Sequence, residues 1–507
     1  MKRILVIAGS DSSGGAGLEA DQKVIAAHGC YAMTATTALT AQNTLGVDAI
    51  HEIPSDFVRR QIDACVSDIG VDVVKTGMLA SADTVSMVAK ALREHKIAVS
   101  VIDPVMVATT GAKLLPDAAV KTLCNDLLPE TYILTPNIPE AKLILQESGR
   151  EQSEIRNVDD LIDLARAIHR LGVKYVLLKG GHIPLTAKYE IAALDEQKEI
   201  VVNVLVGEDV CEVFDLSYRK SKNTHGTGCS LASAIACNLA QSRDVPAAVF
   251  SACRYVDAGI RLSINLGKGS GPINHFHSLQ ILPFTPGNFT EYLLSRADVK
   301  PAWHDFTHHE FVRQMGDGTL PLEWFKYYMI QDYIYLIHFA RANALAGYKT
   351  KSLDGVARAA EIVLHIREET ALHIRECAEL GLTMQQIEES EESQACTAYT
   401  RYVLDIGQSE DWLALQISLL PCLLGYHVIA KRLDELQRTD PPATANRYKT
   451  WIDNYVNEGY SSAVTTGCAL IEKHIVHQSP RRINELVKIF IQATRMETGF
   501  WDMASAP

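Results

Sequence analysis

The pattern of apolar residues changes near the middle of the chain, and this change most limits what the chain can fold into. Up to about residue 280, short apolar runs such as RILVIAG, DVVKTGM and KYVLLKGG alternate with amphipathic segments such as ADTVSMVAKALREH. Beyond residue 300, long segments with helical periodicity dominate, at 322–347, 352–381, 412–437 and 482–504. Two regions with different periodicities predict two domains of different fold class.

The first region is predicted to be an α/β domain. Its short strands end in Gly, Pro, Asn or Asp, and helical segments lie between them, which indicates a mostly parallel sheet covered on both faces. Ligands bind at the carboxyl ends of the strands in such sheets. The polar residues expected at those ends are Asp103, Asn137, Glu140 and Lys179.

The second region is predicted to be an all-helical bundle. The chain has 507 residues, which is too long for one compact core. Between the two regions, FHSLQILPFTPGNFTEY contains Pro283, Pro286 and Gly287, which make a short, stiff connector. We therefore expect domains at residues 1–283 and 288–507.

Composition narrows the classes of partner. The formal net charge is -13 and no basic run occurs, which disfavours nucleic acid and favours small-molecule substrates. We expect no membrane span, because no uninterrupted apolar run approaches the length that one needs. Eleven cysteines are scattered without a CxxC pair, which is typical of a reducing compartment and predicts a cytoplasmic protein.

The segment NTHGTGCS indicates a phosphoryl-transfer site. Glycines at Gly226 and Gly228 flank Thr227, so that backbone N–H groups can point inward, and an apolar helix follows. Inward N–H groups and the positive end of a helix stabilise charge on a transferring phosphoryl group. Two other segments are rich in glycine. AGSDSSGGAGLEAD matches neither the dinucleotide-binding pattern nor a Walker A motif, and LLKGGH is a strand that ends in a flexible turn with a lysine.

Three residues of the second region combine into a possible hydrolytic site. Asp332 and Glu497 lie in apolar helical segments, where an unpaired carboxylate is costly to bury, and Cys422 lies in a third such segment. Tyr335 follows Asp332 by one turn, and Tyr426 follows Cys422 by four residues. If these helices meet in the bundle core, they supply a nucleophile, a proton donor and a substrate anchor.

The motifs of the first region resemble one kinase family. AGSDSSGGAGLEADQK, TALTAQNT, KTGML, DPVM, TPNIPEA, LLKGGH, NTHGTGC and GPINHFH are similar, in this order, to the hydroxymethylpyrimidine/phosphomethylpyrimidine kinases of thiamine biosynthesis. That family has a ribokinase-like fold. The resemblance implies two successive phosphorylations, of 4-amino-5-hydroxymethyl-2-methylpyrimidine and of its monophosphate. It also implies ATP with Mg²⁺ as co-substrate and no prosthetic group.

The same resemblance implies roles for individual residues. The pyrimidine is expected to contact Gln42, Asp21, Met78, Gly9 and Val105. The Gln42 amide offers a donor and an acceptor to the aminopyrimidine edge. The ATP and its phosphates are expected at Asp103, Asn137, Glu140, Lys179, Gly226, Thr227 and Gly228, with Mg²⁺ near Asp103 and Glu140.

Cys229 stands where many relatives in the broader ribokinase-like group carry an aspartate base. A free thiol has a pKa near ~8.5 and a helix N-terminus lowers it, so a Cys229 thiolate can take the hydroxymethyl proton. Alternatively, its backbone N–H and small volume shape the anion hole, since a loose transition state needs little early proton transfer. Both interpretations stay open at this point.

The second region resembles the TenA-type thiaminase II family, which has a haem-oxygenase-like helical fold. The similar segments are GDGTLPLEWFKYYMIQDYIYL, LLPCLLGY, WIDNYVNEGY and METGFWDMA. The resemblance implies that Cys422 is the nucleophile, Glu497 the acid/base and Asp332 the aminopyrimidine ligand. It also implies contacts from Tyr335, Tyr426 and Tyr455, and from either Tyr399 or Tyr402.

A kinase followed by a thiaminase II resembles the fused salvage enzymes of fungi. Hydrolysis of thiamine or of an aminomethylpyrimidine breakdown product would release the pyrimidine that the kinase consumes. Both families form homo-oligomers, so the resemblance also implies an oligomer, and two different symmetric interfaces favour a tetramer.

Rival interpretations remain for each region. Glu361, His365, Glu369 and His373 repeat at i, i+4 on one predicted helix, which suggests a metal-dependent oxygenase-like domain. For the first region, a sugar kinase or a pyridoxal kinase of the same fold is the alternative. A non-catalytic binding module is the third class for either region.

Overall fold

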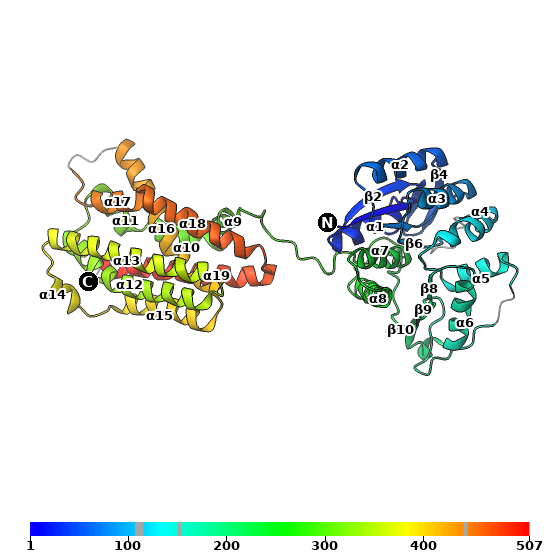
Figure 1. The fold of residues 1–507 in the computed structure, drawn as a ribbon. Coiled ribbons are helices and arrows are strands. Elements are labelled where there is room, and N and C mark those ends of the chain that lie inside the picture. Colours follow the sequence, from blue (N-terminus) through cyan, green and yellow to red (C-terminus); the bar gives the residue numbers. More distant parts are fainter. Residues whose placement is uncertain (107–114, 151–153, 440–444, 506–507) are drawn as a thin grey trace. The chain divides into compact units, whose positions relative to one another are not determined.

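The computed structural model describes residues 1–106, 115–150, 154–439 and 445–505 (Figure 1). The chain forms two compact units, Met1–Leu279 and Gln280–Pro507. The first is α/β and the second is helical. Each unit has its own buried apolar clusters, so each is described by itself.

The first unit is built on an eight-stranded sheet with the order β10-β9-β8-β7-β6-β5-β1-β2. The six strands from β8 to β2 pair in parallel, whereas β9 and β10 add an antiparallel edge. β3 and β4 form a separate antiparallel hairpin. The strands are β1 Arg3–Ala8, β2 Tyr31–Thr36, β3 Ala38–Asn43, β4 Gly46–Glu52, β5 Val73–Thr76, β6 Ser100–Ile102, β7 Ile133–Leu134, β8 Tyr175–Lys179, β9 Ile200–Gly207 and β10 Cys211–Ser217.

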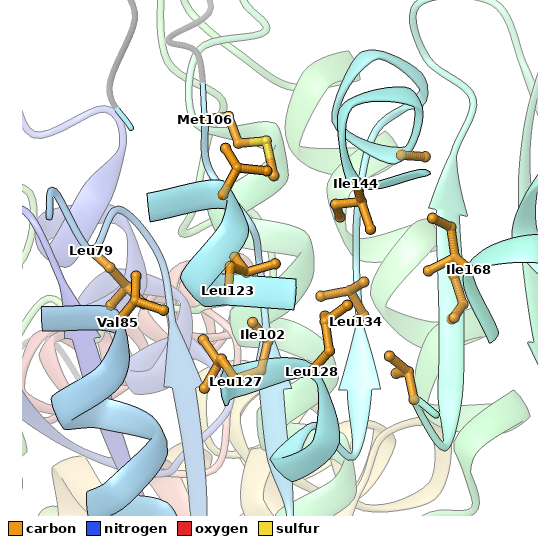
Figure 2. Packing of buried hydrophobic residues seen from close by; sticks show 14 of the residues in the cluster. Leu79, Val85, Ile102, Met106, Leu123, Leu127, Leu128, Leu134, Ile144 and Ile168 are labelled. Carbon is orange, nitrogen blue, oxygen red and sulfur yellow. The ribbon is translucent and has the colours of Figure 1, made fainter. Parts of the chain in front are cut away.

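Helices cover both faces of this sheet, which explains why its central strands are continuously apolar. Along β1, Leu5 and Ile7 join the cluster under α2, α3, α5 and α6, whereas Ile4 and Val6 join the cluster under α1, α7 and α8. Figure 2 shows part of the first cluster around Ile102 of β6. The helices are α1 Gly17–Ala27, α2 Ser55–Asp68, α3 Ala82–Glu94, α4 Asp117–Thr122, α5 Ile138–Glu147, α6 Val158–His169, α7 Thr227–Ala240 and α8 Val245–Arg261.

The second unit contains the long helices that the periodicity predicts. The predicted segments 322–347, 352–381, 412–437 and 482–504 correspond to α12 Leu322–Lys349, α13 Leu353–Glu379, α16 Trp412–Thr439 and α19 Pro480–Ser505. The other helices are α9 Phe289–Ser295, α10 Lys300–Thr307, α11 Glu310–Asp317, α14 Met384–Glu388, α15 Gln394–Ser409, α17 Lys449–Val456 and α18 Glu458–Ile475.

Helix α16 is the central helix of this unit. In length and composition it is apolar enough to cross a membrane, but 78% of its most apolar window is buried inside the protein. It packs against α15, α17, α18 and α19 and contributes to both apolar clusters of the unit. A core helix of a helical bundle meets the same length and hydropathy criteria, and the burial explains its apolar character.

Candidate functional sites

The glycine loop before α7 is held by close backbone packing. Gly226 has a φ of +77°, and a Cβ atom there would overlap the carbonyl oxygen of Gly15. A Cβ on Gly228 would lie 3.3 Å from Lys179 Nζ and 3.6 Å from Asp103 Oδ2. The structure thus brings the predicted phosphate loop, Lys179 and Asp103 together at the N-terminus of α7, where anions bind favourably.

The neighbouring strand ends supply the other polar groups. Lys179 Nζ lies 2.6 Å from Asp103 Oδ1, which also accepts a hydrogen bond from Thr135 Oγ1 at 3.1 Å. Asn137 caps α5, because its side chain accepts from the Glu140 N–H while the Glu140 carboxylate accepts from the Asn137 N–H. Burial raises the pKa of Glu140 to about 7, although the Lys179 ammonium opposes the shift.

A small apolar wall stands beside this polar group. A Cβ on Gly9 would overlap the Met78 side chain, and Met78 packs with Ala38 and Ala80 against Val105. Gln42 lies at the end of β3 and is partly exposed. Gly9, Met78 and Val105, which were predicted to contact the pyrimidine, therefore lie close together.

Asp21 occupies a different position from the other predicted substrate ligands. Its carboxylate is fully buried and lies 2.8 and 2.9 Å from Lys75 Nζ, which is also fully buried. Ser233 of α7 donates a third hydrogen bond at 2.7 Å. This carboxylate joins α1, β5 and α7 beneath the surface. Sequence analysis missed Lys75, although a lysine inside the buried run DVVKTGM was a detectable signal.

Replacing Lys75 by methionine is expected to lower the free energy of unfolding of the first unit by about 3 to 5 kcal/mol, because it leaves the buried Asp21 charge unpaired. Urea unfolding measures this loss. Lys90→Met is the control, since Lys90 is exposed and pairs weakly with Glu94 at 3.8 Å. A loss below about 1 kcal/mol for Lys75→Met would contradict the prediction.

Cys229 lies in the first turn of α7, beside the glycine loop. Burial raises the pKa of its thiol to about 11, and the Lys75 ammonium opposes this rise only in part. This direction is opposite to the lowering expected from a helix N-terminus, because desolvation of a thiolate outweighs the helix dipole here. The resting thiol is therefore neutral at physiological pH.

Two further residues of this site were missed by sequence analysis. His225 Nε2 lies 2.7 Å from Asp11 Oδ2, and both side chains are almost completely buried. The pair connects the glycine-rich loop after β1 with the loop before α7. His225 also lies 3.4 Å from the Gln42 amide. His225 was visible within NTHGTGC, but its partner Asp11 is 214 positions away and no local pattern reveals the pair.

The predicted residues of the helical unit also converge. Tyr399 Oη of α15 donates to Glu497 Oε1 of α19 at 2.7 Å, and Tyr426 Oη of α16 donates to Glu497 Oε2 at 3.4 Å. The Tyr335 ring stacks on Tyr399 with centroids 5.0 Å apart, and Tyr426 and Tyr455 are 5.1 Å apart. The alternative Tyr402 instead donates to a backbone carbonyl of α19 at 3.4 Å, so Tyr399 is the tyrosine of this cluster.

Tyr335, Tyr399, Tyr426 and Tyr455 form an aromatic cage, and the acidic groups within it have shifted pKa values. Burial raises the pKa of Glu497 to about 8 and that of Asp332 to about 6. Burial also raises the pKa of the Cys422 thiol well above its usual range, with the Glu497 charge acting in the same direction. The hydroxyl of Tyr335 is buried and has no hydrogen-bond partner among the residues that the structure describes. The cage therefore offers a neutral thiol, a protonated acid at neutral pH and an unused donor.

His373 of α13 was predicted only as part of a metal set. Its Nε2 lies 2.7 Å from the Met329 carbonyl oxygen, and its Nδ1 lies 3.6 Å from Asp332 Oδ2. His365 pairs with Glu369 at 3.3 Å, and Glu361 is exposed. Within the part of the chain that the structure describes, no group of three or more such side chains is arranged to hold a metal ion. His373 instead faces the Asp332 carboxyl.

Replacing Glu497 by glutamine is expected to change how stability depends on pH. The folded pKa of about 8 lies above the ordinary value of 4.5, so the folded state keeps a proton that the unfolded state releases. This contribution is complete below pH 4.5 and is lost as pH rises towards 8. When the pH rises from 5 to 9, the free energy of unfolding of wild type should fall by up to about 4 kcal/mol more than that of Glu497→Gln. Urea unfolding at both pH values measures this difference, and parallel pH profiles would contradict it.

Comparison with known proteins places both regions in families. The family model for phosphomethylpyrimidine kinase matches residues 11–274, and that for the TENA/THI-4/PQQC family matches residues 296–506. A Schizosaccharomyces pombe protein, whose name proposes hydroxymethylpyrimidine/phosphomethylpyrimidine kinase activity, is 44% identical over 98% of this chain and 90% of its own length. A hydroxymethylpyrimidine/phosphomethylpyrimidine kinase of Saccharomyces cerevisiae is 32% identical over 99% of this chain and 95% of its own length.

Solved structures are also similar to the first region, among them one of a Bacillus subtilis pyridoxal kinase. The ADP complex of Bacillus subtilis pyridoxal kinase is 34% identical, with a TM-score of 0.46, over 54% of this chain and 97% of that chain. The family matches and the observed sheet and helices confirm the predicted α/β ribokinase-like region and the helical TenA-type region. The chain therefore belongs to the phosphomethylpyrimidine kinase family through its first region and to the TENA/THI-4/PQQC family through its second, in the same fusion as its full-length yeast relatives.

Proposed function

We propose that the first unit transfers phosphate from Mg-ATP to 4-amino-5-hydroxymethyl-2-methylpyrimidine and then to its monophosphate. The observation that carries this proposal is the approach of Lys179 and Asp103 to Gly228 at the N-terminus of α7. An ammonium and loop N–H groups around a transferring phosphoryl group are the recurring parts of kinase sites. The names of the yeast relatives, which are hydroxymethylpyrimidine/phosphomethylpyrimidine kinases, support this choice of substrate.

We assign a separate role in this reaction to each of the site residues. Gln42 pairs with the aminopyrimidine edge. The hydroxymethyl oxygen attacks the terminal phosphorus of ATP, the bond from that phosphorus to the bridging oxygen breaks so that ADP leaves, and the hydroxyl proton passes to an oxygen of the transferred phosphoryl group. Lys179 and the N–H groups of Gly226 to Gly228 bind the charge on the transferring group. Asp103 and Glu140 are the carboxylates that would hold Mg²⁺, which prefers such oxygens together with phosphate. Because its thiol is neutral, Cys229 acts through its backbone N–H and small volume.

We further propose that the helical unit hydrolyses thiamine or aminomethylpyrimidine breakdown products. The Cys422 sulfur adds to the pyrimidine ring while its proton passes to the ring nitrogen held at Asp332. From an aminomethylpyrimidine, the amino group leaves the exocyclic methylene as ammonia with a proton from Glu497, which is protonated at neutral pH. The thiazolium of thiamine leaves the same carbon as a neutral thiazole and needs no proton. Water then adds to the methylene and gives up a proton, which goes to Glu497 after loss of ammonia and to solvent after loss of thiazole. The sulfur leaves the ring and takes back the proton held on the ring nitrogen. The product is the pyrimidine alcohol that the kinase consumes.

One experiment tests the kinase proposal directly. The full chain is incubated with Mg-ATP and hydroxymethylpyrimidine, and the phosphates added are counted by mass spectrometry. Two phosphates are expected, one would restrict the activity to the first step, and none would refute the proposal. Pyridoxal in a parallel reaction tests the alternative substrate.

A second experiment tests the helical unit. The full chain is incubated with thiamine or with aminomethylpyrimidine, and the release of hydroxymethylpyrimidine is measured. The domain boundaries 1–283 and 288–507, the tetramer and the cytoplasmic location stay predictions.

A further inference from the structure

Two cysteines of the first unit lie in contact although they are far apart in the sequence. Cys30 lies in the loop between α1 and β2, and Cys237 lies near the C-terminal end of α7. Their side chains share a hydrogen bond, and both belong to the apolar cluster under α1, α7 and α8. Both are free thiols. The fold therefore keeps two reduced sulfurs next to each other.

Gln241, which ends α7, holds the Cys30 thiol from a second side. Its amide Nε2 lies 2.9 Å from the His28 carbonyl oxygen and 3.7 Å from Cys30 Sγ. Gln241 follows Cys237 by four residues, so the two side chains lie on the same face of α7. The Cys30 sulfur therefore accepts from an amide and from a thiol that project from one helix.

These contacts make the two thiols unequal in acidity. The hydrogen bond from Cys237, assisted by that from Gln241, outweighs burial and lowers the pKa of Cys30 to about 7. The same hydrogen bond raises the pKa of Cys237 well above its usual range. Among the charged groups near Cys30, the N-terminal ammonium also lowers its pKa and Asp72 raises it. Cys30 thus supplies a thiolate at neutral pH, and Cys237 keeps its proton.

The two thiols also differ in access. Cys30 is 7% exposed, whereas Cys237 is fully buried. Cys30 follows Gly29, whose φ is +69° and whose Cβ, if it had one, would meet no atom within 4 Å. The loop is therefore not packed against other elements at Gly29, so it can make the small movement that an S–S bond of about 2.05 Å requires. A small oxidant reaches Cys30 first.

We propose that Cys30 and Cys237 form a redox-modification site, in which a hydroperoxide oxidises Cys30 and Cys237 then closes a disulfide with it. Cys30 is the attacking thiol and Cys237 the resolving thiol, which is the arrangement of redox-sensing cysteines. The inference does not depend on either proposed catalytic activity.

The chemistry takes two steps and consumes one hydroperoxide. The Cys30 thiolate attacks one peroxide oxygen, the O–O bond breaks, and the released hydroxide takes a proton to become water, which leaves a sulfenic acid on Cys30. The Cys237 sulfur then attacks the Cys30 sulfur and loses its proton to the departing hydroxide, which becomes the second water. The two thiols together lose two hydrogens, and the peroxide is reduced.

Other cysteines of this unit lack the features that activate Cys30. Burial raises the pKa of Cys229, on the same helix, to about 11 and that of Cys253, on α8, to about 12. Neither thiol supplies a thiolate at neutral pH, and the thiolate is the form that reacts with peroxide. We therefore expect oxidation to be selective for Cys30.

The test treats the reduced full chain with hydrogen peroxide, alkylates the remaining thiols and maps the peptides by mass spectrometry without reductant. Peptides containing residues 30 and 237 are expected to be linked, and a dithiol reductant should release them. Cys30→Ser should abolish the link. Cys237→Ser should instead leave a sulfenic acid on Cys30, which dimedone traps. Cys253→Ser is the matched control, because Cys253 accepts from Asn203 at 3.4 Å, and it should form the link as wild type does.

Two results on the wild-type chain would overturn the proposal, so it does not depend on the folding of the variants. The first is a peroxide dose that oxidises the exposed Cys211 but leaves Cys30 and Cys237 as thiols. The second comes from the rate of Cys30 alkylation by iodoacetamide as a function of pH. Its midpoint is expected near pH 7, and a midpoint near the ordinary thiol value of 9 would show that Cys30 supplies no thiolate at neutral pH.

Discussion

Replacing Cys422 by serine is expected to lower the proposed hydrolysis by the helical unit at least about 1,000-fold, because a hydroxyl is a much weaker nucleophile than sulfur towards a pyrimidine ring. Cys422 lies on α16 beside Tyr335 and within the influence of the Glu497 charge. Its thiol is neutral at rest, so it must lose its proton as the sulfur–carbon bond forms. Release of hydroxymethylpyrimidine from aminomethylpyrimidine measures the effect.

The same chain provides the internal control for this experiment. Phosphorylation of added hydroxymethylpyrimidine should be unchanged in Cys422→Ser, because the kinase unit has its own buried core. Cys468→Ser is the matched substitution, since Cys468 is a half-buried cysteine of α18 in the same unit. A Cys422→Ser protein that hydrolyses its substrate at more than a tenth of the wild-type rate would refute the nucleophile assignment.

The sequence alone predicted the elements of this fold, because the spacing of apolar residues along the chain reflects which positions are buried. The run RILVIA is apolar at every position after Arg3, and the structure buries Ile4 and Val6 on one face of the sheet and Leu5 and Ile7 on the other. The helices of the second unit were predicted in the same way, since the bounds of α12, α13, α16 and α19 agree with the predicted segments to within a few residues. In both cases, the information lies within one element.

Pairings between distant elements could not be predicted in this way. The Lys75–Asp21 pair spans 54 positions and the His373–Asp332 pair spans 41, so neither leaves a local pattern. The protonation state of Cys229 is a further case, because a helix N-terminus is visible in sequence but the desolvation that outweighs it is not. Motifs located the sites, whereas tertiary packing set the charges within them.

Replacing Gly226 by alanine is expected to lower phosphorylation at least about 100-fold, because it displaces the N–H groups that we propose bind the transferring phosphate. Two physical effects combine at this position. The φ of +77° is strained for any residue with a Cβ, and that Cβ would overlap the carbonyl oxygen of Gly15. The loop before α7 must therefore move away from the loop after β1. Steady-state phosphorylation of hydroxymethylpyrimidine measures the loss.

Gly181→Ala separates this effect from the general cost of removing a glycine. Gly181 lies two residues after Lys179, but a Cβ there meets no atom within 4 Å and its backbone does not require a glycine. Its phosphorylation rate should stay within about twofold of wild type. Hydrolysis by the helical unit should be unchanged in both variants. Gly226 and Gly15 belong to different loops, which the substitution forces apart. A Gly226→Ala enzyme with near-normal activity would show that the site still binds the phosphate after the loops separate. The close packing of the two loops would then have no role in catalysis.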